Sequence, residues 1–220
     1  MSAAGPLRLE DVARCMAPHA PMYRWRPPVY QFVALEGLAR LWDPKHRTAL
    51  DVGGGTGLMA QTIKTLFALE RVVSVDVTDR YLPSLDIETR TFEGVALPFA
   101  SGAFDCVLLM NVLHHVPVAA RPGLLRECRR VAGSGPLYIK DHVSTGRLDD
   151  VRLAALDLLG NLPFHGMVRA CYLREPDWTH LADASGYEIG APQSGAYRRG
   201  LSAWLFPNRL ELSMRWQPKR

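Results

Sequence analysis

The sequence predicts a single α/β domain built around a mostly parallel β-sheet with helices on both faces. The first observation is length, because 220 residues favour one domain and can bury a sizeable core. The second is an alternation of short apolar runs with amphipathic stretches. The third is that each run is apolar at consecutive positions, as in strands that are covered on both faces. The strand candidates are residues 48–52, 72–77, 104–110 and 136–140.

The amphipathic stretches between the runs predict helices. One begins near Val33 and is closed by Asp43-Pro44, and a second follows the glycines of residues 53–57. The first thirty residues predict a short helix and an irregular arm, whereas the last thirty predict β-structure. Three further apolar stripes each predict a helix. The first is Leu124, Leu125, Cys128 and Val131, and the third is Trp178, Leu181 and Ala182. The second is Leu148, Val151, Ala155 and Leu158, on a helix of about residues 148–159.

Composition excludes several classes of protein. The formal net charge of +4 is too small to indicate a nucleic-acid partner. Four cysteines without a C-x-x-C pair predict a reducing compartment, and the first residues lack the apolar run of a signal peptide. The longest apolar stretch, residues 106–113, is far shorter than the ~20 residues of a membrane span. We therefore expect a cytoplasmic protein without a membrane span.

The strongest local signal is the run Asp51-Val52-Gly53-Gly54-Gly55-Thr56-Gly57, between a strand and a helix. Glycines there let the chain turn sharply and let a ligand approach the backbone. The dinucleotide motif G-x-G-x-x-G fails because its third glycine falls on Leu58, and the P-loop fails because no lysine follows Gly57. An acidic residue followed by G-x-G-x-G remains.

Four segments in order resemble the class I methyltransferases that use S-adenosylmethionine. They are the glycine loop; Val75-Asp76 at the end of the second strand; Glu93-Gly94-Val95-Ala96-Leu97-Pro98-Phe99; and Phe104-Asp105 with Asn111-Val112-Leu113-His114-His115-Val116. The resemblance covers roughly residues 47–142, and residues 126–131 resemble the helix before the fifth strand.

The resemblance implies a Rossmann-like sheet of seven strands, parallel except for one near the end, in a single domain over residues 1–220. The core would span 45–142, with a small helical cap from 1–44 and 143–175. S-adenosylmethionine would be the cofactor, with Asp76 on the ribose hydroxyls and Glu93 and Gly94 near the adenine. Glu93 fits a solvated loop carboxylate equally well. The expected cofactor-binding residues are Asp51, Gly53, Gly55, Gly57, Asp76, Glu93, Gly94 and Asn111.

Two departures from the family pattern concern the adenine contacts. Sixteen residues separate Asp76 from Glu93 and Pro83 interrupts them, so we expect a turn where the family has a helix. Phe92 also stands where a glycine is usual.

The catalytic candidates are His142 and Asp141, at the end of the fifth strand. A histidine oriented by a carboxylate is a plausible general base, and a loop contact is an equal alternative. His114 or His115 is the next candidate for a base, and Asn111 fits a satisfied core residue as well as a ligand contact. No metal ligand set is expected. The other pocket candidates are Tyr23, His165 and Tyr172.

The region after residue 142 predicts a small hydrophobic or aromatic methyl acceptor, because it is apolar and contains aromatic residues. Lys140-Asp141-His142, Asp157, Gly160-Asn161, His165-Gly166 and Tyr172-Leu173 together resemble a bacterial subgroup linked to aryl-polyene and polyketide-like pathways. That resemblance implies an acceptor that could be carried by an acidic acyl carrier protein.

Two other functions stay open. One is a nucleic-acid methyltransferase, although the basic and aromatic C-terminal stretch around Glu211 better fits a strand with one solvated face. The other is a cofactor-binding protein without catalysis.

Overall fold

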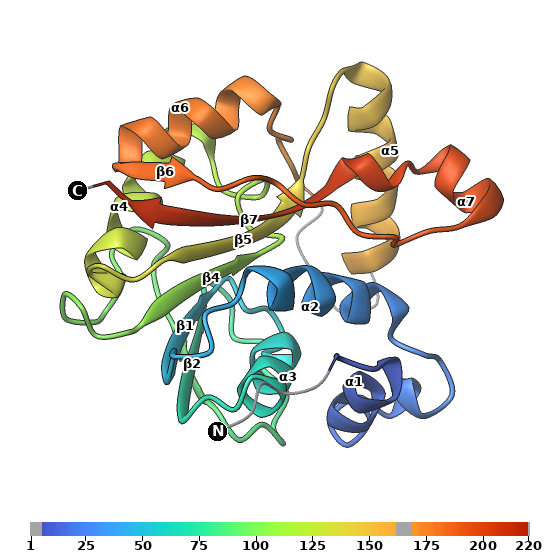
Figure 1. Cartoon of the computed structure of the whole chain (residues 1–220), viewed down its shortest axis with the longest axis horizontal. Helices are drawn as coiled ribbons and strands as arrows, with labels where there is room; N and C mark the ends of the chain where they lie inside the picture. The colour runs from blue at the N-terminus through green and yellow to red at the C-terminus, as the bar shows by residue number, and fades with distance from the viewer. Residues whose placement is uncertain (1–5, 162–168, 220) are drawn as a thin grey trace.

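The computed structural model describes residues 6–161 and 169–219. Its centre is one seven-stranded sheet in the order β3-β2-β1-β4-β5-β7-β6 (Figure 1). The five strands β1 to β5 all run parallel to one another, whereas β7 runs antiparallel to both of its neighbours, β5 and β6. The predicted α/β fold with one antiparallel strand is therefore confirmed. The strands are β1 (Thr48–Val52), β2 (Arg71–Asp76), β3 (Glu88–Thr91), β4 (Cys106–Met110), β5 (Leu137–His142), β6 (Tyr187–Ile189) and β7 (Glu211–Pro218).

Helices cover both faces of the sheet. On one face, α1, α2 and α3 pack against buried residues of β1, β2, β4 and β5. On the other, α4 and α6 bury Leu125, Cys128 and Trp178 against the same strands, as their stripes predicted. The helices are α1 (Leu9–Met16), α2 (Val29–Leu41), α3 (Leu58–Leu66), α4 (Arg121–Ala132), α5 (Arg147–Asn161), α6 (Glu175–Ser185) and α7 (Gly200–Leu205), with short 3₁₀ turns at Pro21–Arg24, Val118–Ala120 and Asn208–Leu210.

The connection between β2 and β3 contains turns and no helix, as Pro83 predicted. It nevertheless packs closely on the glycine loop. A Cβ added at Gly57 would lie 2.5 Å from Leu85 Cδ1 and 3.1 Å from Tyr81 Cδ1. The shortened connection therefore covers the start of α3.

The prediction for the buried face of α5 was wrong. Leu148, Val151 and Leu158 are exposed, whereas Asp149, Leu153 and Asp157 are buried. These last three recur every four residues and therefore share one face of the helix. The carboxylates can be buried because each has cationic or hydrogen-bonding partners: Arg209 binds Asp149, and Tyr172 donates to Asp157. The apolar periodicity therefore predicted the helix correctly but predicted the wrong face of it to be buried.

The C-terminal segment also differs from the prediction. It contains the helix α7 before β7, so the last thirty residues are not all β. β7 is not a strand with a solvated face, because it lies between β5 and β6 and its residues Glu211 to Met214 are all buried. Glu211, which was expected to face solvent, is fully buried because Lys140 and Arg198 pair with its carboxylate. Within the described residues, no helix is long and apolar enough to cross a membrane.

Candidate functional site

The glycine loop connects the carboxyl end of β1 to α3. Gly53, Gly55 and Gly57 all have positive φ angles, between +60° and +77°, in the left-handed region that side chains other than glycine rarely adopt. Gly53 is also tightly packed, since an added Cβ would lie 2.7 Å from Val112. The loop is thus fixed against the segment that follows β4, which is how the sequence brings two of the predicted motifs together.

Two aspartates at the ends of neighbouring strands lie beside this loop. Asp76, at the end of β2, accepts a hydrogen bond from the Gly55 N–H at 2.8 Å and another from the Thr78 N–H at 3.0 Å. Asp51 is buried and accepts a hydrogen bond from the Ser74 hydroxyl at 2.8 Å. Burial raises the pKa of Asp51 to about 7, because the Ser74 hydrogen bond offsets only part of the desolvation.

The two expected adenine contacts lie beside this loop. Phe92 N–H donates to the Asp76 carbonyl at 3.1 Å, which ties the residues after β3 to the end of β2. Gly94 has a φ of +78°, and an added Cβ would lie 3.2 Å from Val77. Glu93 between them is exposed. Glu93 and Gly94 therefore lie close to the end of β2, and their contact with an adenine stays a prediction.

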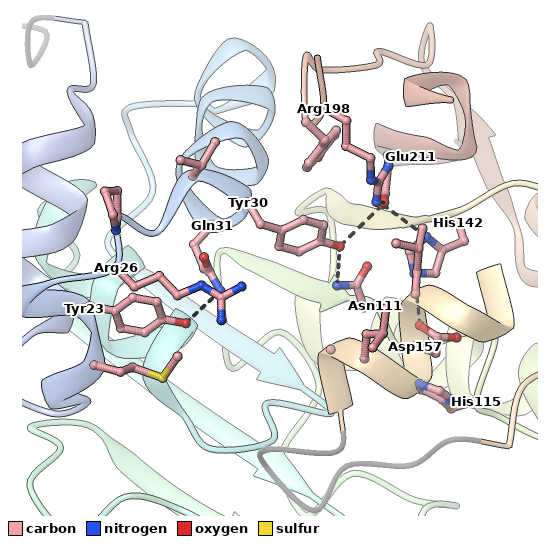
Figure 2. A pocket seen from close by; sticks show the side chains of 17 residues that line it. Tyr23, Arg26, Tyr30, Gln31, Asn111, His115, His142, Asp157, Arg198 and Glu211 are labelled. Atoms are coloured by element: carbon pink, nitrogen blue, oxygen red, sulfur yellow. Dashed lines mark hydrogen bonds and ion pairs between the residues drawn. The ribbon is translucent and has the colours of Figure 1, made fainter. Parts of the chain in front are cut away.

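A cavity of about 590 Å³ opens at the carboxyl ends of β4 and β5 (Figure 2). One wall comes from the N-terminal segment and α2, and the opposite wall from α5. Figure 2 shows Tyr23, Arg26 and Gln31 at one end, and His142, Asp157 and His115 at the other. The side chains that line it are Met22, Tyr23, Arg26, Pro27, Val29, Tyr30, Gln31, Asn111, His115, His142, Leu156, Asp157, Leu159, Gly160, Tyr197, Arg198 and Glu211.

A buried network of charged side chains forms the floor of this cavity. Lys140 Nζ donates to Asn111 Oδ1 at 2.6 Å, to Glu211 Oε2 at 2.5 Å and to the Tyr30 hydroxyl. Asn111 Nδ2 donates to the same hydroxyl at 3.1 Å, and Asn111 itself has a φ of +60°. Burial alone would raise the pKa of Glu211, but the Lys140 ammonium and the His142 ring hold it well below its ordinary value. Arg198 adds a second cation, 2.6 Å from Glu211 Oε1.

His142 lies between two carboxylates. Its Nδ1 is 3.1 Å from Glu211 Oε2 and its Nε2 is 3.3 Å from Asp157 Oδ1. Burial and the neighbouring Lys140 ammonium lower the pKa of His142, but the Asp157 and Glu211 carboxylates outweigh them and raise it to about 9.

The expected side-chain pair of Asp141 with His142 does not form. Successive side chains of a strand point to opposite faces, so the Asp141 carboxylate faces away from the His142 ring. It binds His114 Nδ1 and accepts from the N–H groups of Leu113 and His142, at 2.9 and 2.7 Å. The burial of Asp141 would raise its pKa, but the His114 ring lowers it to about 2. Asp141 thus orients His114.

Sequence reasoning missed several members of the site. Tyr30, Lys140, Asp157 and Glu211 were not among the catalytic or binding candidates, although Lys140 carried a usable signal. A lysine inside a buried strand requires a carboxylate partner. Of the other pocket candidates, Tyr23 lines the cavity and Tyr172 donates to Asp157 at 2.5 Å. His165 lies outside the described residues.

Comparison with known proteins agrees with this geometry. Residues 50–139 match a family model described as a methyltransferase domain. An uncharacterized methyltransferase of Mycobacterium sp. (strain KMS) is 37% identical over 112 residues, which are 46% of this chain and 43% of that protein. The demethylspheroidene O-methyltransferase of Rhodobacter capsulatus is 30% identical over 156 residues, 66% of this chain and 37% of that one. The chain spans less than half the length of these relatives.

Solved structures share the fold over nearly the whole chain. A chain from the complex that contains the Haloferax volcanii Trm112 methyltransferase activator has a TM-score of 0.68 at 14% identity, covering 97% of this chain and 100% of that one. A SAM-dependent methyltransferase of Methanosarcina mazei has a TM-score of 0.61 at 15% identity, covering 83% and 96%. Residues 50–139 therefore match a methyltransferase domain, and the chain shares its fold with solved methyltransferases, one of which is SAM-dependent.

Proposed function

We propose that this chain transfers a methyl group from S-adenosylmethionine to a small hydrophobic or aromatic acceptor held in the cavity of Figure 2. The observation that carries the proposal is the position of that cavity. It begins at Asn111, directly after β4, and the next residue, Val112, packs on Gly53 of the glycine loop. Methyl transfer is an in-line displacement, so a cofactor on the loop and an acceptor in the cavity would need to meet near Asn111.

In this proposal the glycine loop and two acidic residues bind the cofactor. Asp76 uses two backbone N–H groups, and a carboxylate has further lone pairs for the ribose hydroxyls. Asp51 would face the charged end of the cofactor, and Glu93 with Gly94 the adenine. Asn111 would lie where the two ligands meet. The residues of this proposed cofactor site are Asp51, Gly53, Gly55, Gly57, Asp76, Glu93, Gly94 and Asn111.

The lining of the cavity supports an acceptor with an apolar body. Met22, Leu156 and Leu159 give it apolar walls, and Tyr23 and Tyr30 give it aromatic ones. The Rhodobacter relative is by name an O-methyltransferase of demethylspheroidene, which favours a hydroxyl as the methylated group. Delivery of the acceptor by an acidic carrier protein remains part of the proposal, supported by the exposed Arg26 at the cavity. We place the reaction in the cytoplasm, where the free thiols of Cys106 and Cys128 would persist.

His142 is the proposed acceptor-contacting residue. It lines the cavity with Asp157, and both lie opposite the aromatic wall. Both ring nitrogens of His142 lie near carboxylates, so neither is free to take a proton from the acceptor. His142 would instead orient the acceptor, or the acceptor's proton would pass to Asp157. Asp141 would act indirectly, by fixing His114 beside His142; the two rings are 4.8 Å apart between centroids.

Calorimetry with S-adenosylhomocysteine tests the cofactor part of the proposal. Gly55→Val should abolish binding, because it adds a side chain where the ligand approaches the backbone and strains a residue at φ +60°. Gly102→Val is the matched control: it has a φ of +67°, has open space around it and precedes β4 at the opposite edge of the sheet. Equal binding in both variants, or stronger binding of NAD than of S-adenosylhomocysteine, would reject the assignment.

The acceptor part needs a separate measurement. Once an acceptor is found, His142→Ala should keep binding S-adenosylhomocysteine but lose roughly 10²-fold or more in turnover. Wild-type turnover would show that His142 is a packing residue.

A further inference from the structure

Three buried side chains from three separate segments converge at the inner end of the cavity. His114 follows β4, His142 ends β5, and Asp157 comes from α5. Each offers a nitrogen or oxygen atom, and these atoms all lie within 4.8 Å of one another. The side chains are 0%, 4% and 7% exposed respectively. Such a convergence of two imidazoles and a carboxylate, away from solvent, is the composition of a transition-metal site.

The distances within the cluster suit a small divalent ion. Asp157 Oδ1 is 3.3 Å from His142 Nε2, and Asp157 Oδ2 is 3.5 Å from His114 Nε2. Ligands about 2.0–2.2 Å from a tetrahedral Zn²⁺ are separated from each other by roughly 3.3–3.5 Å. The ligand nitrogens of the two histidines lie within 4.8 Å of each other, so this pair must approach for the same geometry. Both distances from Asp157 to the histidine nitrogens are longer than an ordinary N–H···O hydrogen bond, which is about 2.7–3.2 Å between the heavy atoms.

The surroundings of both histidines have the pattern of metal-bound imidazoles. In such sites the ring nitrogen that does not bind the metal donates to a carboxylate, which fixes the tautomer and the ring. His114 Nδ1 binds Asp141, and His142 Nδ1 lies 3.1 Å from Glu211. Both Nε2 atoms therefore turn toward Asp157. Within the described part of the chain, neither His114 Nε2 nor His142 Nδ1 has an aligned hydrogen-bond partner although both are buried, so Glu211 lies near His142 Nδ1 at an ion-pair distance only.

Asp157 is held as well. The Tyr172 hydroxyl donates to Asp157 Oδ2 at 2.5 Å, and the Tyr172 ring stacks on His114 with centroids 5.7 Å apart. Every expected ligand thus has a neighbour that restricts it: Asp141, Glu211 or Tyr172. Each ring thus lies between an inner carboxylate, that of Asp157, and an outer one, that of Asp141 or Glu211.

We propose that His114, His142 and Asp157 bind one divalent transition-metal ion of the Zn²⁺ type. His142 and Asp157 also line the cavity, so a fourth position would face the acceptor. Mg²⁺ and Ca²⁺ do not fit, because they prefer oxygen ligands throughout. The purpose of the ion rests on the proposed function: a hydroxyl acceptor bound to it would lose its proton more easily. His142 then serves as a ligand, and its contact with the acceptor runs through the ion.

Zinc binding to the full chain tests the site without turnover. After treatment with a chelator, calorimetric titration with Zn²⁺ should give one tight site per chain. Asp157→Asn and His114→Ala should each weaken it by roughly 100-fold or more, and Tyr172→Phe by about 10–100-fold through its hold on Asp157. His180→Ala, which removes an exposed histidine on α6, should bind Zn²⁺ as the wild type does.

Cobalt(II) identifies the ligands independently. The Co²⁺ form should show the visible bands of a tetrahedral site without thiolate-to-cobalt absorption, which excludes binding by the exposed Cys171. No zinc binding by the wild type, or equal binding by Asp157→Asn, would overturn the proposal and leave a buried ionic network. Tyr172→Phe keeps the buried charges, so it serves if the other variants fail to fold. S-adenosylhomocysteine binding in the same samples reports separately on the proposed function.

Discussion

The two halves of the carboxyl edge of the sheet are built by different means. On the side of β1, β2 and β3, three glycines and two aspartates within residues 51–76 form a backbone cradle, and its contacts are mostly local. On the side of β4, β5 and β7, the cavity floor joins Tyr30, Asn111, Lys140 and Glu211, which are up to 181 residues apart. The first half, here called the cofactor half because the cofactor is proposed to bind there, depends on backbone shape. The second, here called the cavity half, depends on side-chain charges that must neutralise one another. The predictions below separate these two dependences.

The largest expected effect is on the stability of the cavity half. Glu211→Ala leaves Lys140 and Arg198 buried without their carboxylate, and breaking a buried pair in this way typically costs about 3–5 kcal/mol of unfolding free energy. Urea unfolding measures the loss. The double variant Lys140→Met/Glu211→Leu should recover part of it, because it removes the most buried cation together with its carboxylate and leaves Arg198 unpaired. A loss below ~1 kcal/mol for Glu211→Ala would show that the network is solvated.

The next effect concerns cofactor binding by the cofactor half. Asp76→Ala removes the expected hydrogen bonds to the ribose, each worth ~1.5–3 kcal/mol, so affinity for S-adenosylhomocysteine should fall about 10–100-fold. It also releases the Gly55 N–H, which the cofactor half uses to hold its loop. Calorimetry gives the affinity, and Asp86→Ala, on the exposed connection after β2, is the control. Unchanged affinity in Asp76→Ala would remove Asp76 from the site.

A smaller effect is the pH dependence of cofactor binding. Desolvation raises the pKa of Asp51 to about 7, so the ionised fraction rises from roughly a tenth at pH 6 to nine tenths at pH 8. If ionised Asp51 faces the cofactor ammonium, affinity for S-adenosylhomocysteine should increase roughly tenfold over that interval. Asp51→Asn should flatten the profile, and parallel profiles in the two proteins would contradict the contact.

The same group gives the opposite trend for stability without ligand. Since the folded pKa of Asp51 is above its unfolded value, its contribution is fully present below pH ~4 and is lost as the pH rises through about 7. The unfolding free energy of the free protein should therefore fall from pH 5 to pH 8, and by less in Asp51→Asn.

The smallest effect lies outside both halves. Glu36 and Arg40 form an exposed pair one turn apart on α2, 3.1 Å between their charged atoms. Glu36→Ala should cost less than about 0.5 kcal/mol. Urea unfolding of this variant sets the scale for Glu211→Ala, and a comparable loss in both would mean that burial does not distinguish the two pairs.

The sequence predicted the backbone conformation of the cofactor half well for a physical reason, and cofactor binding by its residues stays a prediction. The conformations of Gly53, Gly55 and Gly57 are available to glycine and strained for other residues, so residue type alone indicated the loop. Asp76 was predicted from its place in the sequence, because it ends an apolar strand. The seven-stranded fold with its antiparallel strand was confirmed as well.

The cavity half was predicted poorly, also for a physical reason. Asp157 lies on the polar face of an amphipathic helix, and that face would normally contact water. Its burial depends on Tyr172 and His142, which no local pattern connects to it. Glu211 likewise alternates with apolar residues, and its burial depends on Lys140 and Arg198, which no local pattern connects to it. Long-range charge pairing leaves little trace in local periodicity.

The place of β7 in the sheet has a consequence for biosynthesis. β7 lies between β5 and β6 although it is the last of the seven strands to be translated. A nascent chain that stops before residue 211 has completed β6, yet one edge of β5 is unpaired and Lys140 has no carboxylate from β7. An unpaired apolar strand edge is a template for aggregation. The domain can therefore complete its core only after β7 leaves the ribosome, and until then the β5 edge is the segment that a chaperone would have to shield.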